Sequence, residues 1–140
     1  MKDPTPISAH KPEFKAAIIT FTKLARELLE LVAAGKSKRE ENGYSYLLVG
    51  TLWEYEDDGD CLEFKHVDGT FVRVYGDLAS DYGTLDPYYF HVFLSTSPQY
   101  KHLAELLPDD FSDTARLLDE LESEGFLRRS NLYPIWHALA

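Results

Sequence analysis

Acidic side chains that could bind a cation gather around one Asp-Gly pair. They are Glu54, Glu56, Asp57, Asp58, Asp60 and Glu63, all within the stretch WEYEDDGDCLEF. Carboxylates at this density suit electrostatic binding of Lys and Arg side chains. Paired carboxylates also act as general acid and base, but only where a pocket separates their pKa values, and nothing in the pattern marks a pocket. The cluster therefore favours binding of a basic surface over catalysis.

The other residue types that do chemistry form no catalytic or metal-binding pattern. No two histidines are four residues apart, and none lies beside a Glu in the metalloprotease arrangement. Cys61 follows the acidic residues Asp57 to Asp60, whose charge raises the pKa of a thiol and suppresses the nucleophilic thiolate. The chain has no Gly-rich phosphate loop, G-x-S-x-G elbow or kinase signature. We therefore expect no metal, no cofactor and no enzyme; an enzyme would need a pocket that joins His66 or His91 to an Asp.

The net charge narrows the class of partner. Among 140 residues, 14 Lys and Arg face 24 Asp and Glu, which gives a net charge of -10. A chain this acidic is poorly suited to generic binding of a phosphate backbone or an anionic membrane. The acidity is concentrated in residues 43–84, which hold 2 basic and 9 acidic groups. This distribution predicts a basic protein as the partner, rather than a membrane or a nucleic acid.

Length and cysteine usage indicate one cytoplasmic domain. A chain of 140 residues lies in the single-domain range, so residues 1–140 are expected to form one core. The single Cys61 cannot form an internal disulfide and fits a reducing compartment. Residues 1–10 are polar, without the apolar run of a signal peptide, and no stretch approaches the roughly 20 apolar residues of a membrane span. We expect a cytoplasmic protein with a flexible leader at 1–10.

The acidic cluster needs elements that hold it in place, and the first of these is a helix. Apolar residues recur at helical spacing from Phe14 to Val32. Pro12 suits the first helical turn, and Gly35 suits the C-terminal stop. The pattern predicts a long N-terminal helix. The following residues 36–42, KSKREEN, are predicted to be a polar linker.

The cluster itself lies in a predicted antiparallel meander of three strands. Residues 44–75 hold three runs of β-type residues, separated by Asp58-Gly59 and Asp68-Gly69, the strongest short-range hairpin signal. Two-residue loops would pair Trp53 with Phe64, Tyr55 with Leu62, Leu62 with Tyr75 and His66 with Phe71, all on the core face. Glu54 would then lie opposite Glu63 on the other face. Such a like-charge pair costs about 0.2–1 kcal/mol, which indicates either a binding surface or a solvated tip whose charges are screened by salt.

The C-terminal part begins with an ambiguous segment. Residues 76–87 read as a loop, because they contain two glycines, three aspartates up to Asp86 and a closing proline. Aromatic and β-branched content at 89–97 favours a fourth strand, but periodicity does not exclude a short buried helix at that length. Leu103 to Leu107 predict a short helix stopped by Pro108, and Ser112 is the predicted N-cap of a last helix that ends at Gly125.

Residues 103–129, LAELLPDDFSDTARLLDELESEGFLRR, resemble the helix-turn-helix core of winged-helix regulators. The resemblance implies DNA binding through Ser112, Thr114 and Arg116 on the recognition helix, and through Arg128 and Arg129 at the start of the wing. The charge of the segment opposes this role, because its four aspartates would repel phosphates. The alternative interpretation is that the two helices are only a packing unit.

The combined prediction is an α+β fold. A long N-terminal helix packs on an antiparallel sheet of three or four strands, and two short helices in a helix-turn-helix-like arrangement follow. In size and charge the chain is similar to small acidic immunity proteins that neutralise bacterial toxins and to phage inhibitors of nucleic-acid-handling proteins. The leading hypothesis is a non-enzymatic inhibitor that covers a basic site. Its predicted binding residues are Glu54, Glu56, Asp57, Asp58, Asp60 and Glu63, with Tyr55, Tyr82 and Tyr88 as anchors. A winged-helix DNA-binding regulator is the second hypothesis.

Overall fold

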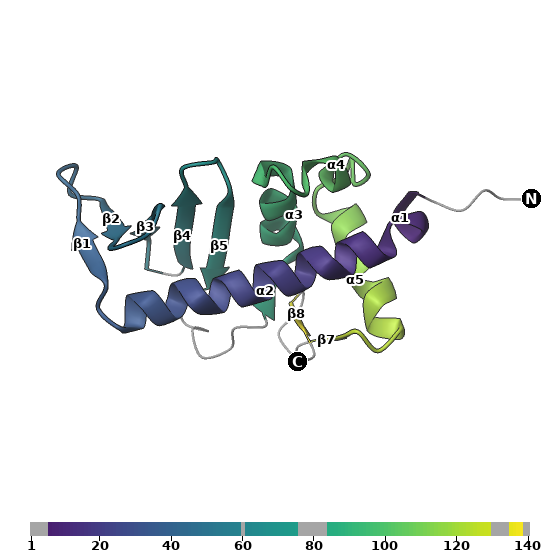
Figure 1. The fold of residues 1–140 in the computed structure, drawn as a ribbon. Helices are drawn as coiled ribbons and strands as arrows, with labels where there is room; N and C mark the ends of the chain where they lie inside the picture. Colours follow the sequence, from purple (N-terminus) through teal and green to yellow (C-terminus); the bar gives the residue numbers. More distant parts are fainter. Residues whose placement is uncertain (1–5, 60, 76–83, 130–134, 139–140) are drawn as a thin grey trace, which may run out of the picture.

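A computed structural model describes residues 6–59, 61–75, 84–129 and 135–138. The fold is α+β, as predicted. The long helix α2 (Lys11–Ala33) runs past a five-stranded sheet at one end and a group of shorter helices at the other (Figure 1). The single turn α1 (Pro6–Ala9) precedes it, so part of the predicted flexible leader is helical, and Ile7 packs against the core. No helix within the described ranges is long and apolar enough to cross a membrane.

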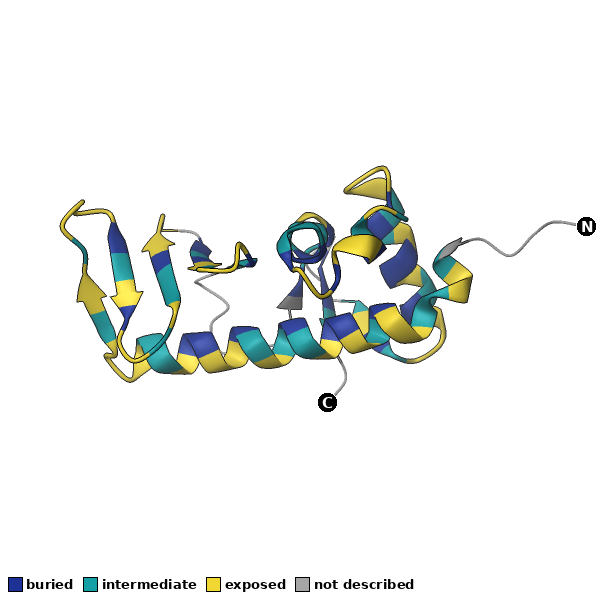
Figure 2. Ribbon diagram, turned by 45° about the horizontal axis from the view of Figure 1, so that its top comes forward, coloured by how far each residue is buried: buried dark blue, intermediate teal, exposed yellow. Residues whose placement is uncertain are grey.

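Helix α2 confirms the predicted N-terminal helix. Its buried side chains, from Phe14 through Phe21 to Leu29, lie on the side that faces the strands and the other helices, while the opposite side is exposed (Figure 2). The helix stops where Gly35 adopts a positive φ of 75°, which suits a residue without Cβ. One helix face therefore supplies core contacts to both ends of the molecule.

The sheet has five antiparallel strands in chain order. They are β1 (Ser37–Arg39), β2 (Ser45–Leu48), β3 (Trp53–Asp57), β4 (Cys61–His66) and β5 (Phe71–Tyr75). The sheet therefore has two more strands than the predicted three-stranded meander. The polar linker forms β1 because the side-chain oxygen Oδ1 of Asn42 accepts the N–H groups of Tyr44 and Ser45 at 2.8 and 3.0 Å, which reverses the chain. The run that precedes the acidic cluster is divided into two strands by a turn in which Gly50 has a φ of 82°.

The β3–β4 hairpin is shifted by two residues from the predicted register. Trp53 pairs with His66, and Tyr55 pairs with Phe64. The reason is the turn, which closes through the Asp58 N–H and the Cys61 carbonyl at 3.1 Å, one residue later than the Asp-Gly pair suggests. A shift of two residues keeps every side chain on its predicted face. The predicted pair of Glu54 and Glu63 is therefore not formed. Instead, Glu54 lies opposite Lys65, and Glu56 lies opposite Glu63.

The β4–β5 hairpin is shifted by one residue, and this shift reverses the faces of β5. Leu62 pairs with Val74 rather than Tyr75, and the pairing of His66 with Phe71 is also wrong. The turn contains three residues, because the His66 N–H donates to the Thr70 carbonyl at 2.9 Å and Gly69 has a φ of 101°. Val72 and Val74 therefore enter the core, whereas Phe71 and Arg73 lie on the other side of the sheet.

The C-terminal part is helical with a small second sheet. Its elements are β6 (Thr84–Leu85), α3 (Pro87–Thr96), α4 (Lys101–Ala104), α5 (Ser112–Ser123), β7 (Leu127–Arg129) and β8 (Trp136–Ala138), and the three strands pair in the order β6-β8-β7. The favoured strand at 89–97 is wrong, since this segment is the helix α3. The helix forms because the Asp86 carboxylate accepts the N–H groups of Tyr88 and Tyr89, and Pro87 occupies the first turn.

Candidate functional site

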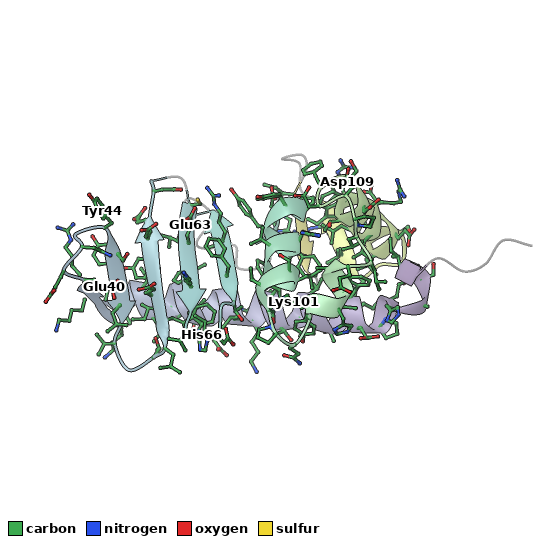
Figure 3. All side chains as sticks on the ribbon, turned by 90° about the horizontal axis from the view of Figure 1, so that it is seen from above. Glu40, Tyr44, Glu63, His66, Lys101 and Asp109 are labelled. Carbon is green, nitrogen blue, oxygen red and sulfur yellow. The ribbon has the colours of Figure 1, made fainter. Side chains whose placement is uncertain are left out.

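Glu54, Glu56 and Glu63 lie on the face of the sheet that is turned away from α2. We call this the outer face, and it carries Leu47, Glu54, Glu56, Glu63, Lys65, Phe71 and Arg73. Figure 3 looks onto it with α2 behind the sheet, and no described element crosses in front of these strands. Strand alternation put Glu54, Glu56 and Glu63 on one face in the prediction, and the structure brings these three together. The outer face is the candidate site.

Like charges are adjacent at two places on the outer face. Glu56 lies directly opposite Glu63 in the β3–β4 pair. Glu54 lies beside Glu40 of the β1–β2 turn, and the pKa of Glu40 is raised by its burial and then by the hydrogen bond and charge of Glu54. Within the described residues no ion pair involves Glu54 or Glu56. Glu54 and Glu56 therefore carry negative charge that a cation would neutralise, whereas Glu63 already has an ion pair with Arg73.

Arg73 contacts three polar side chains at the end of the outer face where Figure 3 labels Glu63. Its guanidinium lies 3.4 Å from a carboxylate oxygen of Asp58 and 3.4 Å from one of Glu63. Its Nε donates to Cys61 Sγ at 3.0 Å, while the thiol lies 3.1 Å from the Asp58 carboxylate. Asp58, Cys61 and Glu63 have the donor types and mutual distances of a metal site, with their ligand atoms within 4.8 Å of one another. The guanidinium is already the cation that these three groups share, so we do not assign a metal there.

The first turn of α3 extends the outer face with aromatic side chains. The Arg73 guanidinium lies 4.9 Å from the centre of the Tyr89 ring, a cation–π contact. Tyr88 is next to it, with ring centres 6.3 Å apart and 44% of the residue exposed. The predicted anchor Tyr88 therefore contacts Tyr89, which in turn contacts Arg73. Sequence patterning did not identify Arg73 or its contact with Tyr89, because this contact joins β5 to α3.

Other predicted site residues lie elsewhere. Tyr55 is buried on the core face, where its hydroxyl is 2.6 Å from Ser37 Oγ, so it does not anchor a partner on the outer face. Asp57 is exposed at the end of β3, and its carboxylate accepts the Gly59 N–H at 2.9 Å. Asp60 and Tyr82 lie outside the described residues.

Cys61 should react slowly in the native protein. Its pKa is raised, chiefly by burial and also by Asp58, although Arg73 acts in the opposite direction. The folded protein should therefore react with Ellman's reagent more slowly than the urea-unfolded chain at pH 8. Its rate should continue to rise above pH 10, where an ordinary cysteine with a pKa of 9.0 levels off. A native rate equal to the unfolded rate would show that the thiol is accessible.

The two histidines considered for catalysis have structural contacts. The His66 ring packs against Trp53 with centres 4.8 Å apart, and its Nδ1 accepts the Asp68 N–H at 3.1 Å. His66 Nδ1 also lies 3.0 Å from the Asp68 carboxylate, which in turn accepts the Thr70 N–H at 2.8 Å in the same turn. His91 Nε2 lies 3.2 Å from the Leu107 carbonyl. Within the described ranges, no side-chain contact of His66 is with a hydroxyl or thiol that could act as a nucleophile.

The residues implied by the winged-helix resemblance do not form an open basic surface. Thr114 is fully buried. Arg116 lies 3.8 Å from Asp113, and Arg129 lies 3.7 Å from Asp119 with its guanidinium over the Trp136 ring. Ser112 and Arg128 are exposed. At the start of α5 the pKa of Asp109 is lowered by hydrogen bonds from the Ser112 and Phe111 N–H groups, so a carboxylate holds the position where a DNA phosphate would bind.

Comparison of the chain with known protein families, curated proteins and solved structures finds no match.

Proposed function

We propose that this chain is a non-enzymatic binding protein whose outer face covers a basic site on a partner protein. It would act as a small acidic inhibitor in the cytoplasm. The partner would be a bacterial toxin, for which this chain is the immunity protein, or a nucleic-acid-handling protein, for which it is a phage-type inhibitor. In both cases the partner's functional surface is rich in Lys and Arg, which the outer face would occlude.

One observation carries the proposal. Glu56 lies opposite Glu63, and Glu54 lies beside Glu40, on a sheet face that no described element covers. Like charges opposite each other destabilise a free sheet by about 0.2–1 kcal/mol. Lys or Arg side chains of a partner placed between these carboxylates would convert the repulsion into attraction. The exposed Tyr88 in the first turn of α3 would offer a ring that holds such a complex once it has formed.

The proposal is tested by charge reversal against a captured partner. The tagged protein is used to retain proteins and nucleic acids from a lysate of the cells that produce it, with low-salt and high-salt washes. The association rate of the retained protein is then measured with a variant that carries Glu54→Lys, Glu56→Lys and Glu63→Lys. We expect the rate constant to fall at least about tenfold at low salt, because electrostatic steering contributes roughly 10–10³ to such rates. The salt dependence should become weaker.

A matched control separates the outer face from the net charge. Glu27→Lys, Glu30→Lys and Asp110→Lys change the net charge by the same amount at exposed positions outside the outer face. This control variant should retain most of the association rate, and circular dichroism should show that both variants are folded. Equal losses in the two variants would mean that the outer face has no special role. A rate that no variant changes would contradict the electrostatic mechanism itself.

A second candidate function is a winged-helix regulator that binds DNA. The observation in its favour is the order of elements, since α4, a turn and α5 are followed by the paired strands β7 and β8, with β6 beside them. Recovery of one discrete DNA fragment in the same capture would support it. Its binding should then be lost when Arg116 and Arg128 are replaced by Glu. Absence of such a fragment, together with a salt-sensitive protein partner, would support the first function.

A further inference from the structure

A groove lies on the outer face at the end of the sheet where Figure 3 labels His66. Its volume is about 360 Å³, near the lower end of the roughly 300–1,000 Å³ that is typical of ligand sites. The turns β2–β3 and β4–β5 meet there, and the Val67 N–H donates to the Leu52 carbonyl at 3.2 Å. This hydrogen bond connects the two turns, which form two walls of the groove and are distant in sequence.

The groove has an exposed aliphatic wall. Leu47, Leu52 and Val67 line it and are 38%, 60% and 73% exposed. Single exposed aliphatic residues are ordinary on protein surfaces, but three that line one concave site form the kind of patch that marks a binding surface. Trp53 lines the same groove and offers a further apolar surface.

The groove also contains two neighbouring carboxyl groups. Glu40 and Glu54 both line it, and burial together with Glu54 raises the pKa of Glu40. Lys65 and His66 are the other titratable groups on its walls. Lys65 pairs with Glu54 across the strands, but no ion pair joins Lys65 to either carboxylate within the part of the chain that the structure describes. The two carboxyl groups outnumber the single ammonium group of Lys65 on the lining.

We propose that this groove receives one Lys or Arg side chain of the partner protein. The methylene stem would lie along Leu47, Leu52 and Val67, and the cationic head would reach Glu40 and Glu54. Long cationic side chains bury their stems in this way while the charged end contacts polar groups. An uncharged apolar side chain would fill the same space but leave the two carboxyl groups facing each other. The inference rests on the proposed function and names the chemical group that the outer face recognises.

The groove is tested with small probes that do not require the partner. The isotope-labelled full chain is titrated with Nα-acetyl-lysine methylamide and with its neutral counterpart, Nα-acetyl-norleucine methylamide. Nuclear magnetic resonance follows the Trp53 indole and the Leu52 and Val67 amides. We expect the lysine probe to bind about fivefold more tightly, the scale of one to two exposed ion pairs. Equal affinities, or shifts confined to residues outside the groove, would overturn the inference.

Two variants and a control assign the preference to the carboxyl groups. Glu40→Gln combined with Glu54→Gln should remove the preference for the lysine probe over the norleucine probe. Glu27→Gln combined with Glu30→Gln changes the net charge equally on the exposed side of α2 and should leave it unchanged. Lys65→Met should strengthen binding of the lysine probe because it removes a competing cation. A preference that survives loss of both carboxylates would contradict the assignment.

Different experimental results would overturn the groove assignment and the proposed inhibitor function. A partner that is sensitive to the triple charge reversal, together with no lysine preference in the probe titration, would retain the inhibitor function and overturn only the groove. Selective binding of the lysine probe without any basic protein partner would retain the groove and overturn the inhibitor function.

Discussion

Replacing Phe21 with Ala should lower the free energy of unfolding by about 3–5 kcal/mol. Phe21 is fully buried in the middle of α2, and its ring makes edge-to-face contacts with Phe90 at 6.0 Å and Phe93 at 5.2 Å between centres. The loss combines the transfer energy of a buried ring, the cavity left behind and aromatic contacts worth about 0.5–1.5 kcal/mol. These contacts join α2 to α3. Urea denaturation followed by circular dichroism measures the change.

A surface variant on the same helix is the control. Ile19 is two residues away and 57% exposed, so Ile19→Ala should change the free energy of unfolding by less than about 0.5–1 kcal/mol. If Phe21→Ala unfolds the protein completely, Phe21→Leu retains most of the volume and keeps the measurement possible. Equal and small losses for Phe21→Ala and Ile19→Ala would show that α2 does not pack on α3 through this ring.

Trp136→Ala should also cost about 3–5 kcal/mol. Trp136 lies in β8, the central strand of the small sheet, and its side chain is almost completely buried. Its indole N–H donates to the Glu122 carboxylate at 3.2 Å, and the Arg129 guanidinium lies 5.1 Å from its ring centre. Truncation would open a cavity between β8 and α5 and leave the Glu122 carboxylate without this donor. The measurement is thermal and urea unfolding of the full chain.

An exposed aromatic residue controls for the loss of a ring. Tyr44 is 76% exposed, so Tyr44→Ala should leave the free energy of unfolding nearly unchanged. Trp136→Phe should recover more than half of the loss caused by Trp136→Ala, because it refills most of the cavity without restoring the hydrogen bond. A Trp136→Ala variant as stable as Tyr44→Ala would contradict the placement of β8 in the core.

The elements with a strong local signal could be predicted from the sequence. Helix α2 follows from apolar spacing with a proline at its start and a glycine at its stop, all within one continuous segment. Helix α3 was only the alternative to a favoured strand, although a local signal for it was present: Asp86 followed by Pro87 is an N-cap with proline in the first turn. Aromatic and β-branched composition favoured a strand there, and the helix forms because the cap and the buried face of α3 outweigh that composition.

The strand registers of the two hairpins could not be predicted from local sequence patterns. Both hairpins contain an Asp-Gly pair, but one turn closes at Asp58 and Cys61 and the other contains three residues. A two-residue shift in the first hairpin preserved the faces, so the acidic face was predicted correctly even though the opposing pairs were not. A one-residue shift in the second reversed β5 and placed Arg73 on the outer face. That shift decides which cation neutralises Asp58 and Glu63.

By itself the sequence determined the α+β class, the long helix and the shared face of Glu54, Glu56 and Glu63, because helical spacing and strand alternation are properties of a single continuous segment. Only the tertiary structure decided that Glu40 lies beside Glu54, that Arg73 contacts Tyr89, and that Leu52 and Val67 line one groove. Each of these contacts joins different turns or elements. Their formation depends on turn length and on packing against α2 and α3, which no single segment encodes.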